Sequence, residues 1–179
     1  MIALAGLSLG ELAAFVADHL RTRGIDVVLV GGACICIYSD NKYRSFDLDF
    51  ITTGMTSRQK IRAALSEINF TEEQRYFKNT ETDFFIEFPS GPLAIGDEPP
   101  GEISSLSYPT GVLRLLSPTD SIKDRLAAYY HWKDRQSLEQ AVLVAGDQPV
   151  DLNEVRRWSA KEGFAEEFEA VRKRFENGR

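Results

Sequence analysis

The sequence predicts an α+β protein in which a region of strands and helices is followed by a purely helical one. In residues 1–116, short apolar segments typical of strands alternate with segments whose apolar residues recur at helical spacing. From Ser117 onward the signals are helical throughout. Four of the seven prolines and three glycines fall in 89–101, which predicts a long loop within the first region. We therefore expect an α/β core in 1–116 and a helical part in 117–179 packed on it.

Two helices of the first region have clear starts. Ser8 and Thr56 are each followed three residues later by Glu or Gln, the pattern of a capping box. The first helix should extend to about Arg23, because Gly24 follows it. The second carries apolar residues at helical spacing from Ile61 onward.

The strand signals of the first region differ in kind. Residues 25–30 are apolar and β-branched, as expected of a buried strand, and residues 46–51 alternate apolar and acidic side chains. Such alternation gives the second strand one face on the core and one polar face. Weaker strand signals occur in four further segments: 75–79, 82–88, 103–106 and 112–116.

Four helices are expected after residue 116. Ser117 as N-cap with Pro118 at the first position starts one, and a second should run from about 134 to 145 with Gly146 as its stop. Asp151 should cap the third, and the fourth covers about 164–175.

Composition excludes several classes of protein. With 179 residues, 43% hydrophobic residues and 27% charged residues, the chain is suited to a packed core rather than to disorder. The formal net charge of −6 argues against a broad surface for phosphate backbones. The 12-residue near-apolar stretch 27–38 is well short of the ~20 residues that cross a bilayer. With no basic n-region at the start, we expect no membrane association and a cytoplasmic protein.

The richest chemical signal is the pair Asp47 and Asp49, which share the polar face of the second strand. Two carboxylates side by side repel each other, and a divalent cation that prefers hard oxygen ligands would relieve the repulsion. A third carboxylate from a later strand would complete a site for two Mg²⁺ ions. Glu87 is favoured because apolar neighbours flank it, with Asp83 as the alternative. A solvated edge strand without metal is the competing interpretation.

Upstream of the acidic pair, Gly31 and Gly32 follow the buried strand directly. Such a turn lets backbone N–H groups approach a phosphate, particularly where a helix begins. Taken alone, the two glycines indicate no more than a turn.

The ordered set of Val30-Gly31-Gly32, then 44–50 (Arg-Ser-Phe-Asp-Leu-Asp-Phe), then Glu87 resembles the polymerase-β-type nucleotidyltransferase superfamily. The Arg-x-x-Asp-x-Asp form, which begins at Arg44, resembles the branch with AbiE-type toxin nucleotidyltransferases of type IV toxin–antitoxin systems and related bacterial proteins. The resemblance covers about residues 27–138. It implies a small mixed sheet with flanking helices.

The resemblance also implies roles for further residues. Lys123 would be catalytic and bind the triphosphate, and Asp134 would contact the nucleotide. In an unbroken helix these two residues, eleven apart, would face the same way. A surface lysine and an N-cap aspartate are the structural alternatives. Arg44, Gly31 and Gly32 complete the nucleotide-binding set.

Two features depart from the superfamily pattern. Ala33 stands where many members have Ser or Thr, and the third acid is Glu87 rather than the commoner Asp.

The resemblance implies a Mg²⁺-dependent nucleotidyltransferase, with Mn²⁺ as a possible substitute. It would move a nucleoside monophosphate from an NTP to an acceptor hydroxyl, with RNA or tRNA as the expected acceptor and a cognate antitoxin as a partner. Two alternatives stay open. One is an enzyme that modifies a protein, such as an antitoxin that acts on its toxin, or a small molecule. The other is a catalytically silent interaction module, which the two departures favour.

Overall fold

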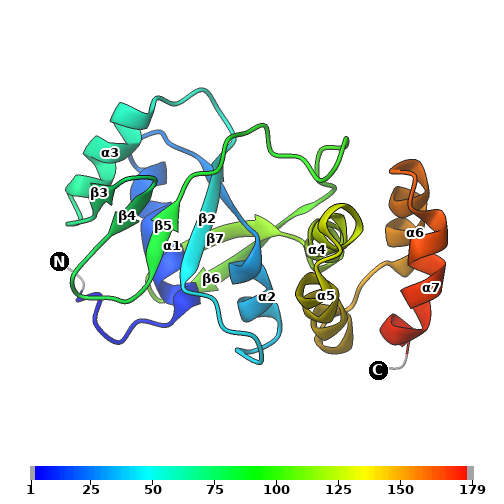
Figure 1. Ribbon diagram of the computed structural model, residues 1–179. Helices are drawn as coiled ribbons and strands as arrows, with labels where there is room; N and C mark the ends of the chain where they lie inside the picture. The colour runs from blue at the N-terminus through cyan, green and yellow to red at the C-terminus, as the bar shows by residue number, and fades with distance from the viewer. Residues whose placement is uncertain (1–2, 177–179) are drawn as a thin grey trace. The chain divides into compact units, whose positions relative to one another are not determined.

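The computed structural model describes residues 3–176, which form an α+β fold with a mixed sheet (Figure 1). The strands are β1 (Val27–Val30), β2 (Asp47–Thr52), β3 (Thr71–Glu73), β4 (Tyr76–Lys78), β5 (Phe85–Glu87), β6 (Ile103–Tyr108) and β7 (Gly111–Leu116). The helices are α1 (Leu9–Arg21), α2 (Gly32–Tyr38), α3 (Arg58–Ser66), α4 (Pro118–Trp132), α5 (Arg135–Asp147), α6 (Leu152–Lys161) and α7 (Ala165–Glu176). The predicted fold class is confirmed.

The sheet has the order β3-β4-β5-β2-β1-β7-β6. Its central strand pair, β1 and β2, is antiparallel, whereas β2 pairs with β5 and β1 pairs with β7 in parallel. Both strands of the central pair lie where the sequence predicts them. Alternation along β2 buries Leu48 and Phe50 completely and leaves Asp47 and Asp49 partly exposed.

One strand was not predicted. The short β3 pairs with β4 in an antiparallel hairpin, so β3, β4 and β5 form a meander at one side of the sheet. Its sequence, Thr-Glu-Glu, is polar and too short to show alternation. The two strands predicted beside it are confirmed in shortened form, as β4 and β5.

The helix starts follow their caps. Ser8 forms the full capping box with Glu11, and Ser117 accepts a hydrogen bond from the backbone N–H of Asp120 with Pro118 at the first position. The prediction that Thr56 caps α3 is wrong by one residue. Ser57 is the N-cap, because its hydroxyl accepts from the backbone N–H of Lys60.

One helix end was also predicted incorrectly. Gly146 does not stop α5, which continues to Asp147. The predicted start of the next helix near residue 134 is confirmed, since α4 ends at Trp132, Lys133 adopts a left-handed conformation with φ 54°, and α5 begins at Arg135. Lys123 and Asp134 therefore do not lie on one unbroken helix. Asp134 then caps α5.

The chain forms two compact units. Unit 1 comprises Met1–Ala33, Ser45–Leu93 and Ile103–Leu115, and unit 2 comprises Cys34–Arg44, Ala94–Glu102 and Leu116–Arg179. Unit 2 therefore holds, besides the C-terminal helices, two segments that the sequence analysis placed in the core region.

The core of unit 1 lies between the sheet and α1, which contacts β1, β6 and α3. The apolar stripe of α1, which includes Leu12, Val16 and Leu20, is fully buried, as are Leu29 and Phe50 of the sheet. The opposite face of the sheet carries the carboxylates, so the core fixes which way they point.

The core of unit 2 lies among α4, α5, α6 and α7, whose mutual contacts define this unit. Tyr130 of α4 stacks on Phe164 with ring centroids 4.7 Å apart, and on Trp158 of α6 at 6.1 Å. Within 3–176, no helix has the length and apolar character needed to cross a membrane.

Candidate functional site

A row of side chains on neighbouring strands of unit 1 forms the candidate site. Asp49 of β2 pairs in register with Glu87 of β5, and Glu87 in turn pairs with Tyr76 of β4. Register partners on adjacent strands project from the same face of a sheet. Asp47, two residues before Asp49, shares that face because side chains alternate along a strand. The strand register thus places the three carboxylates that the sequence singled out on one face of the sheet.

The choice between Glu87 and Asp83 is decided by secondary structure. Glu87 is a strand residue with a side chain that is 20% exposed, beside Asp49. Asp83 lies before β5 in a bend and is exposed. Glu87 is therefore the acid that accompanies the aspartate pair on the sheet.

Asp47 is oriented by a local hydrogen bond. The hydroxyl of the buried Ser45 donates to Oδ1 of Asp47 at 2.7 Å. Because Ser45 precedes β2 by two residues, this contact ties the carboxylate to the start of the strand.

Asp49 is approached closely by the turn after β1. Gly31 has φ +73°, a conformation that glycine adopts readily, and a Cβ atom at this position would lie 2.7 Å from Oδ2 of Asp49. Two effects therefore require glycine here, the backbone angle and the space. Gly32, the second predicted glycine, is the first residue of α2.

Arg75 is a member of the site that the sequence analysis missed. Its Nε lies 3.3 Å from Oε1 of Glu87, and its guanidinium carbon lies 4.8 Å from the centre of the Tyr76 ring. A hydrogen bond to Tyr76 and the negative charges of Glu87 and Asp49 raise the pKa of Arg75. Only the register of β4 against β5 brings this arginine to the acids, and no local sequence signal reports that register.

The donor set is the kind that Mg²⁺ prefers, since three carboxylates on adjacent strands offer hard oxygen ligands. Asp47, Asp49 and Glu87 would hold the ion. The side chain of Glu87, however, is paired with Arg75. Across residues 3–176, no three His, Cys, Asp or Glu side chains form a cluster that could hold a metal ion.

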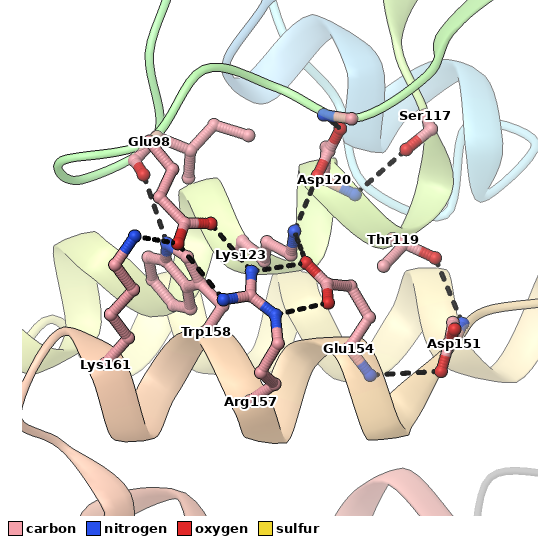
Figure 2. A network of polar contacts seen from close by, with 12 residues as sticks. Glu98, Ser117, Thr119, Asp120, Lys123, Asp151, Glu154, Arg157, Trp158 and Lys161 are labelled. Carbon is pink, nitrogen blue, oxygen red and sulfur yellow. Dashed lines mark hydrogen bonds and ion pairs between the residues drawn. The ribbon is translucent and has the colours of Figure 1, made fainter.

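The remaining predicted residues belong to unit 2. Lys123 is buried on α4, where its Nζ donates to Oε1 of Glu154 at 2.7 Å and lies 3.0 Å from Oδ1 of Asp120 (Figure 2). Asp134 is the N-cap of α5, as the structural alternative proposed, and accepts from the backbone N–H of Gln136. Arg44 lies exposed in the segment before β2.

Lys123 is part of a larger polar network in unit 2 (Figure 2). Glu154 also accepts hydrogen bonds from Arg157, whose guanidinium forms a two-pronged contact with Glu98 at 2.7 and 3.1 Å. Asp120 accepts from the backbone N–H of Gly101 at 2.8 Å. The network therefore connects the segment 94–102 to α4 and α6. Lys123 belongs to it through its contacts with both Asp120 and Glu154.

The fold is similar to that of nucleotidyltransferase-like proteins of known structure. The chain is similar in structure to an antigenic nucleotidyltransferase-like protein from Paracoccidioides brasiliensis, with a TM-score of 0.61 and 15% identity over 97% of this chain and 94% of that one. The solution structure of the antibiotic-resistance factor ANT(2'')-Ia gives a TM-score of 0.55 at 14% identity, covering 94% of this chain and 97% of that one.

A crystal structure of ANT(2'')-Ia in complex with adenylyl-2''-tobramycin gives a TM-score of 0.55 at 16% identity over 86% of this chain and 95% of that one. At these identities the likeness is one of fold. No family model and no curated protein matches the sequence.

Proposed function

We propose that this chain is a Mg²⁺-dependent nucleotidyltransferase that moves a nucleoside monophosphate from an NTP to an acceptor hydroxyl. The observation that carries the proposal is the pairing of Asp49 with Glu87 on the face that also bears Asp47. The nucleotidyltransferase-like fold supports it independently of the sequence motif.

Four residues of unit 1 have parts in the proposed chemistry. Asp47 and Asp49 would hold the metal ions, and Glu87 would supply the third carboxylate. When bound, Mg²⁺ offsets phosphate charge and lowers the pKa of the acceptor hydroxyl. Gly31 leaves room beside Asp49, so the backbone of the turn would come close to the phosphates.

The transfer breaks a phosphoanhydride bond of the NTP and forms a phosphoester bond to the acceptor. The acceptor oxygen forms a bond to the α-phosphorus as the bond from that phosphorus to the bridging oxygen breaks. Pyrophosphate leaves, and the hydroxyl proton passes to water. The protein contributes position and charge rather than a covalent intermediate.

The cationic and capping residues of unit 2 would act on the nucleotide. Lys123 and Arg44 would neutralise charge on the triphosphate, and Asp134 would orient the nucleotide. Lys123 would do so only on exchanging Glu154 for a phosphate oxygen, because its ammonium is already paired.

The proposed acceptor is RNA, notably tRNA, in a toxin–antitoxin context with a cognate antitoxin. This part of the proposal rests on the sequence resemblance to AbiE-type toxins. A small-molecule acceptor is the second candidate, favoured by the fold likeness to ANT(2'')-Ia, whose crystal structure holds adenylyl-2''-tobramycin. A silent interaction module is the third, favoured by Ala33 and by the pairing of Glu87 with Arg75.

The test is transfer of label from each α-³²P-labelled NTP in the presence of Mg²⁺. Separate reactions contain total tRNA, aminoglycosides or candidate partner proteins as acceptor. We expect labelled RNA with the wild-type chain, and loss of label with Asp47→Asn, Asp49→Asn and Glu87→Gln. Asp26→Asn and Asp83→Asn, which change exposed acids off the carboxylate row, serve as matched controls.

The outcomes separate the candidates. Label in the aminoglycoside alone would replace the RNA acceptor by the second candidate. Failure to label any acceptor, or labelling by Asp49→Asn as strong as that by Asp26→Asn, would leave only the silent module.

A further inference from the structure

The guanidinium of Arg75 lies against one of the three carboxylates of the candidate site. Its Nε is 3.3 Å from Oε1 of Glu87, and it also feels the charge of Asp49. No motif in the sequence assigns this arginine a role. Its side chain is 69% exposed, whereas that of Glu87 is 20% exposed. The Arg75 side chain can therefore move away from Glu87 with little disturbance of the fold. The Glu87 side chain is less free to move because more of it is buried.

The backbone of Arg75 is fixed even though its side chain is exposed. Arg75 follows Gln74, whose φ of 59° makes the tight turn between β3 and β4. Arg58 of α3 donates from Nη2 to the carbonyl of Arg75 at 2.8 Å and pairs through Nε with Glu72 at 2.7 Å. These contacts fix the backbone of Arg75 next to β4, and from there its guanidinium reaches Glu87 on β5.

The charge of Arg75 affects how a divalent cation would bind to Glu87. Glu87 and Asp49 are register partners, so their like charges repel, and the cationic Arg75 beside Glu87 offsets part of that repulsion. A divalent ion that binds the same carboxylates meets the positive charge of Arg75 at short range. The two cations therefore compete for Glu87.

We propose that Arg75 is a positioning residue that holds the Glu87 carboxylate and sets the affinity of the site for a divalent cation. The inference rests on the proposed function, because it takes Asp47, Asp49 and Glu87 as the metal-binding set. Arg75 acts through Glu87 and does not touch the reacting atoms. Displacement of its guanidinium is part of metal binding, so the arginine weakens metal binding while it keeps the acids paired.

The test measures Mn²⁺ binding to the full chain by electron paramagnetic resonance of the free ion, without nucleotide or acceptor. Arg75→Gln should bind Mn²⁺ about five- to tenfold more tightly than the wild type, the effect of removing a unit charge roughly 6 Å from a divalent ion in a water-like dielectric. Arg75→Lys keeps the charge and should stay within about twofold of the wild type. Arg23→Gln removes an arginine from another ion pair of unit 1, with Glu67, and should leave the affinity unchanged.

A double substitution shows whether the effect passes through Glu87. The gain in Mn²⁺ affinity from Arg75→Gln should shrink to less than about twofold when Glu87→Gln is also present, because the side chain that Arg75 contacts is then uncharged. Circular dichroism of every variant confirms that the chain is folded.

The results separate this inference from the proposed function. If the wild type binds Mn²⁺ and Arg75→Gln binds it no more tightly, the inference is wrong and the transferase proposal stands. An equal gain in Arg75→Lys, or a full gain in the Glu87→Gln background, also refutes it. If no variant binds Mn²⁺, the metal-dependent function and the inference both fail.

Discussion

Oδ2 of Asp49 lies only 2.7 Å from the point that a Cβ atom on residue 31 would occupy, so the turn after β1 and the acid on β2 are fitted to each other. The sequence feature Gly31-Gly32 and the feature Asp47-x-Asp49 are separated by a helix and a loop. In the structure they are one site, because Val30 and Asp49 are register partners. Gly31 therefore lies directly beside Asp49, one of the three carboxylates of the candidate site.

The substitution Gly31→Ala should reduce both stability and transfer activity. A φ of +73° costs an alanine about 1–2 kcal/mol, and its methyl group would push Asp49 aside. We expect the free energy of unfolding to fall by that amount and labelling of the acceptor to fall about a hundredfold, as for a misplaced ligand. Gly24→Ala is the matched control, since Gly24 has φ +66° but its nearest neighbour, Nζ of Lys60, is 3.7 Å away. Equal labelling by the two variants would contradict the prediction.

Removing Lys123 should destabilise the chain strongly. Its ammonium lies between Asp120 and Glu154, and Asp120 is buried. Lys123→Met leaves that buried carboxylate without its cation, for which we expect a loss of about 3 kcal/mol in urea unfolding. Lys161→Met removes an exposed lysine paired with Glu98 and should cost about 1 kcal/mol or less. Similar unfolding curves for the two variants would show that the buried contact contributes little.

Asp134 should behave as a helix cap. Its carboxylate accepts from the backbone N–H of Gln136 at 3.0 Å and from the hydroxyl of Ser137 at 2.6 Å. Asp134→Ala should therefore lower the free energy of unfolding by about 1 kcal/mol, while Asp134→Asn, which caps nearly as well, should preserve it. Labelling by Asp134→Asn reports on the nucleotide: activity near that of the wild type is expected for a cap alone, and its loss in a stable variant would establish the nucleotide contact.

The elements that could be predicted are those with local signals. The buried β1, the alternating β2 and the capped starts of α1 and α4 depend on residues within a few positions of each other. The start of α5 near residue 134 was predicted, but the end of α4 has no such local signal, because Lys133 adopts a left-handed conformation that no glycine or proline announces. Gly146 was given too much weight, since α5 continues through it to Asp147.

The candidate site could be predicted in part for the same reason. Asp47 and Asp49 stand out in one strand, and Glu87 was favoured by its apolar neighbours. Arg75 could not be found, because its contact with Glu87 depends on the register of a short strand against its neighbour. Lys123 was interpreted as a nucleotide-binding or surface lysine, and its burial was not predicted because its partner Glu154 is 31 residues away in sequence.

Acid should weaken the polar network of unit 2 in a defined pH range. Hydrogen bonds from Arg157 and Lys161 lower the pKa of Glu98 to about 2, and hydrogen bonds from Arg157 and Lys123 lower that of Glu154 to about 2. A carboxyl whose pKa is lowered on folding stabilises the fold above its unfolded value, here about 4.5, and this contribution disappears as the pH falls toward the folded value.

Urea unfolding of the wild type followed at intervals from pH 6 to pH 2 should therefore show a loss of stability that begins near pH 4.5 and continues to about pH 2. Glu98→Gln should be less stable at pH 6 and should lose less stability over the acid range, because one titrating group is gone. Glu73→Gln, which removes an exposed carboxylate paired with Lys78 alone, should keep the pH dependence of the wild type. The prediction fails if Glu98→Gln and the wild type lose stability in parallel, since the network would then contribute no more than an ordinary surface ion pair.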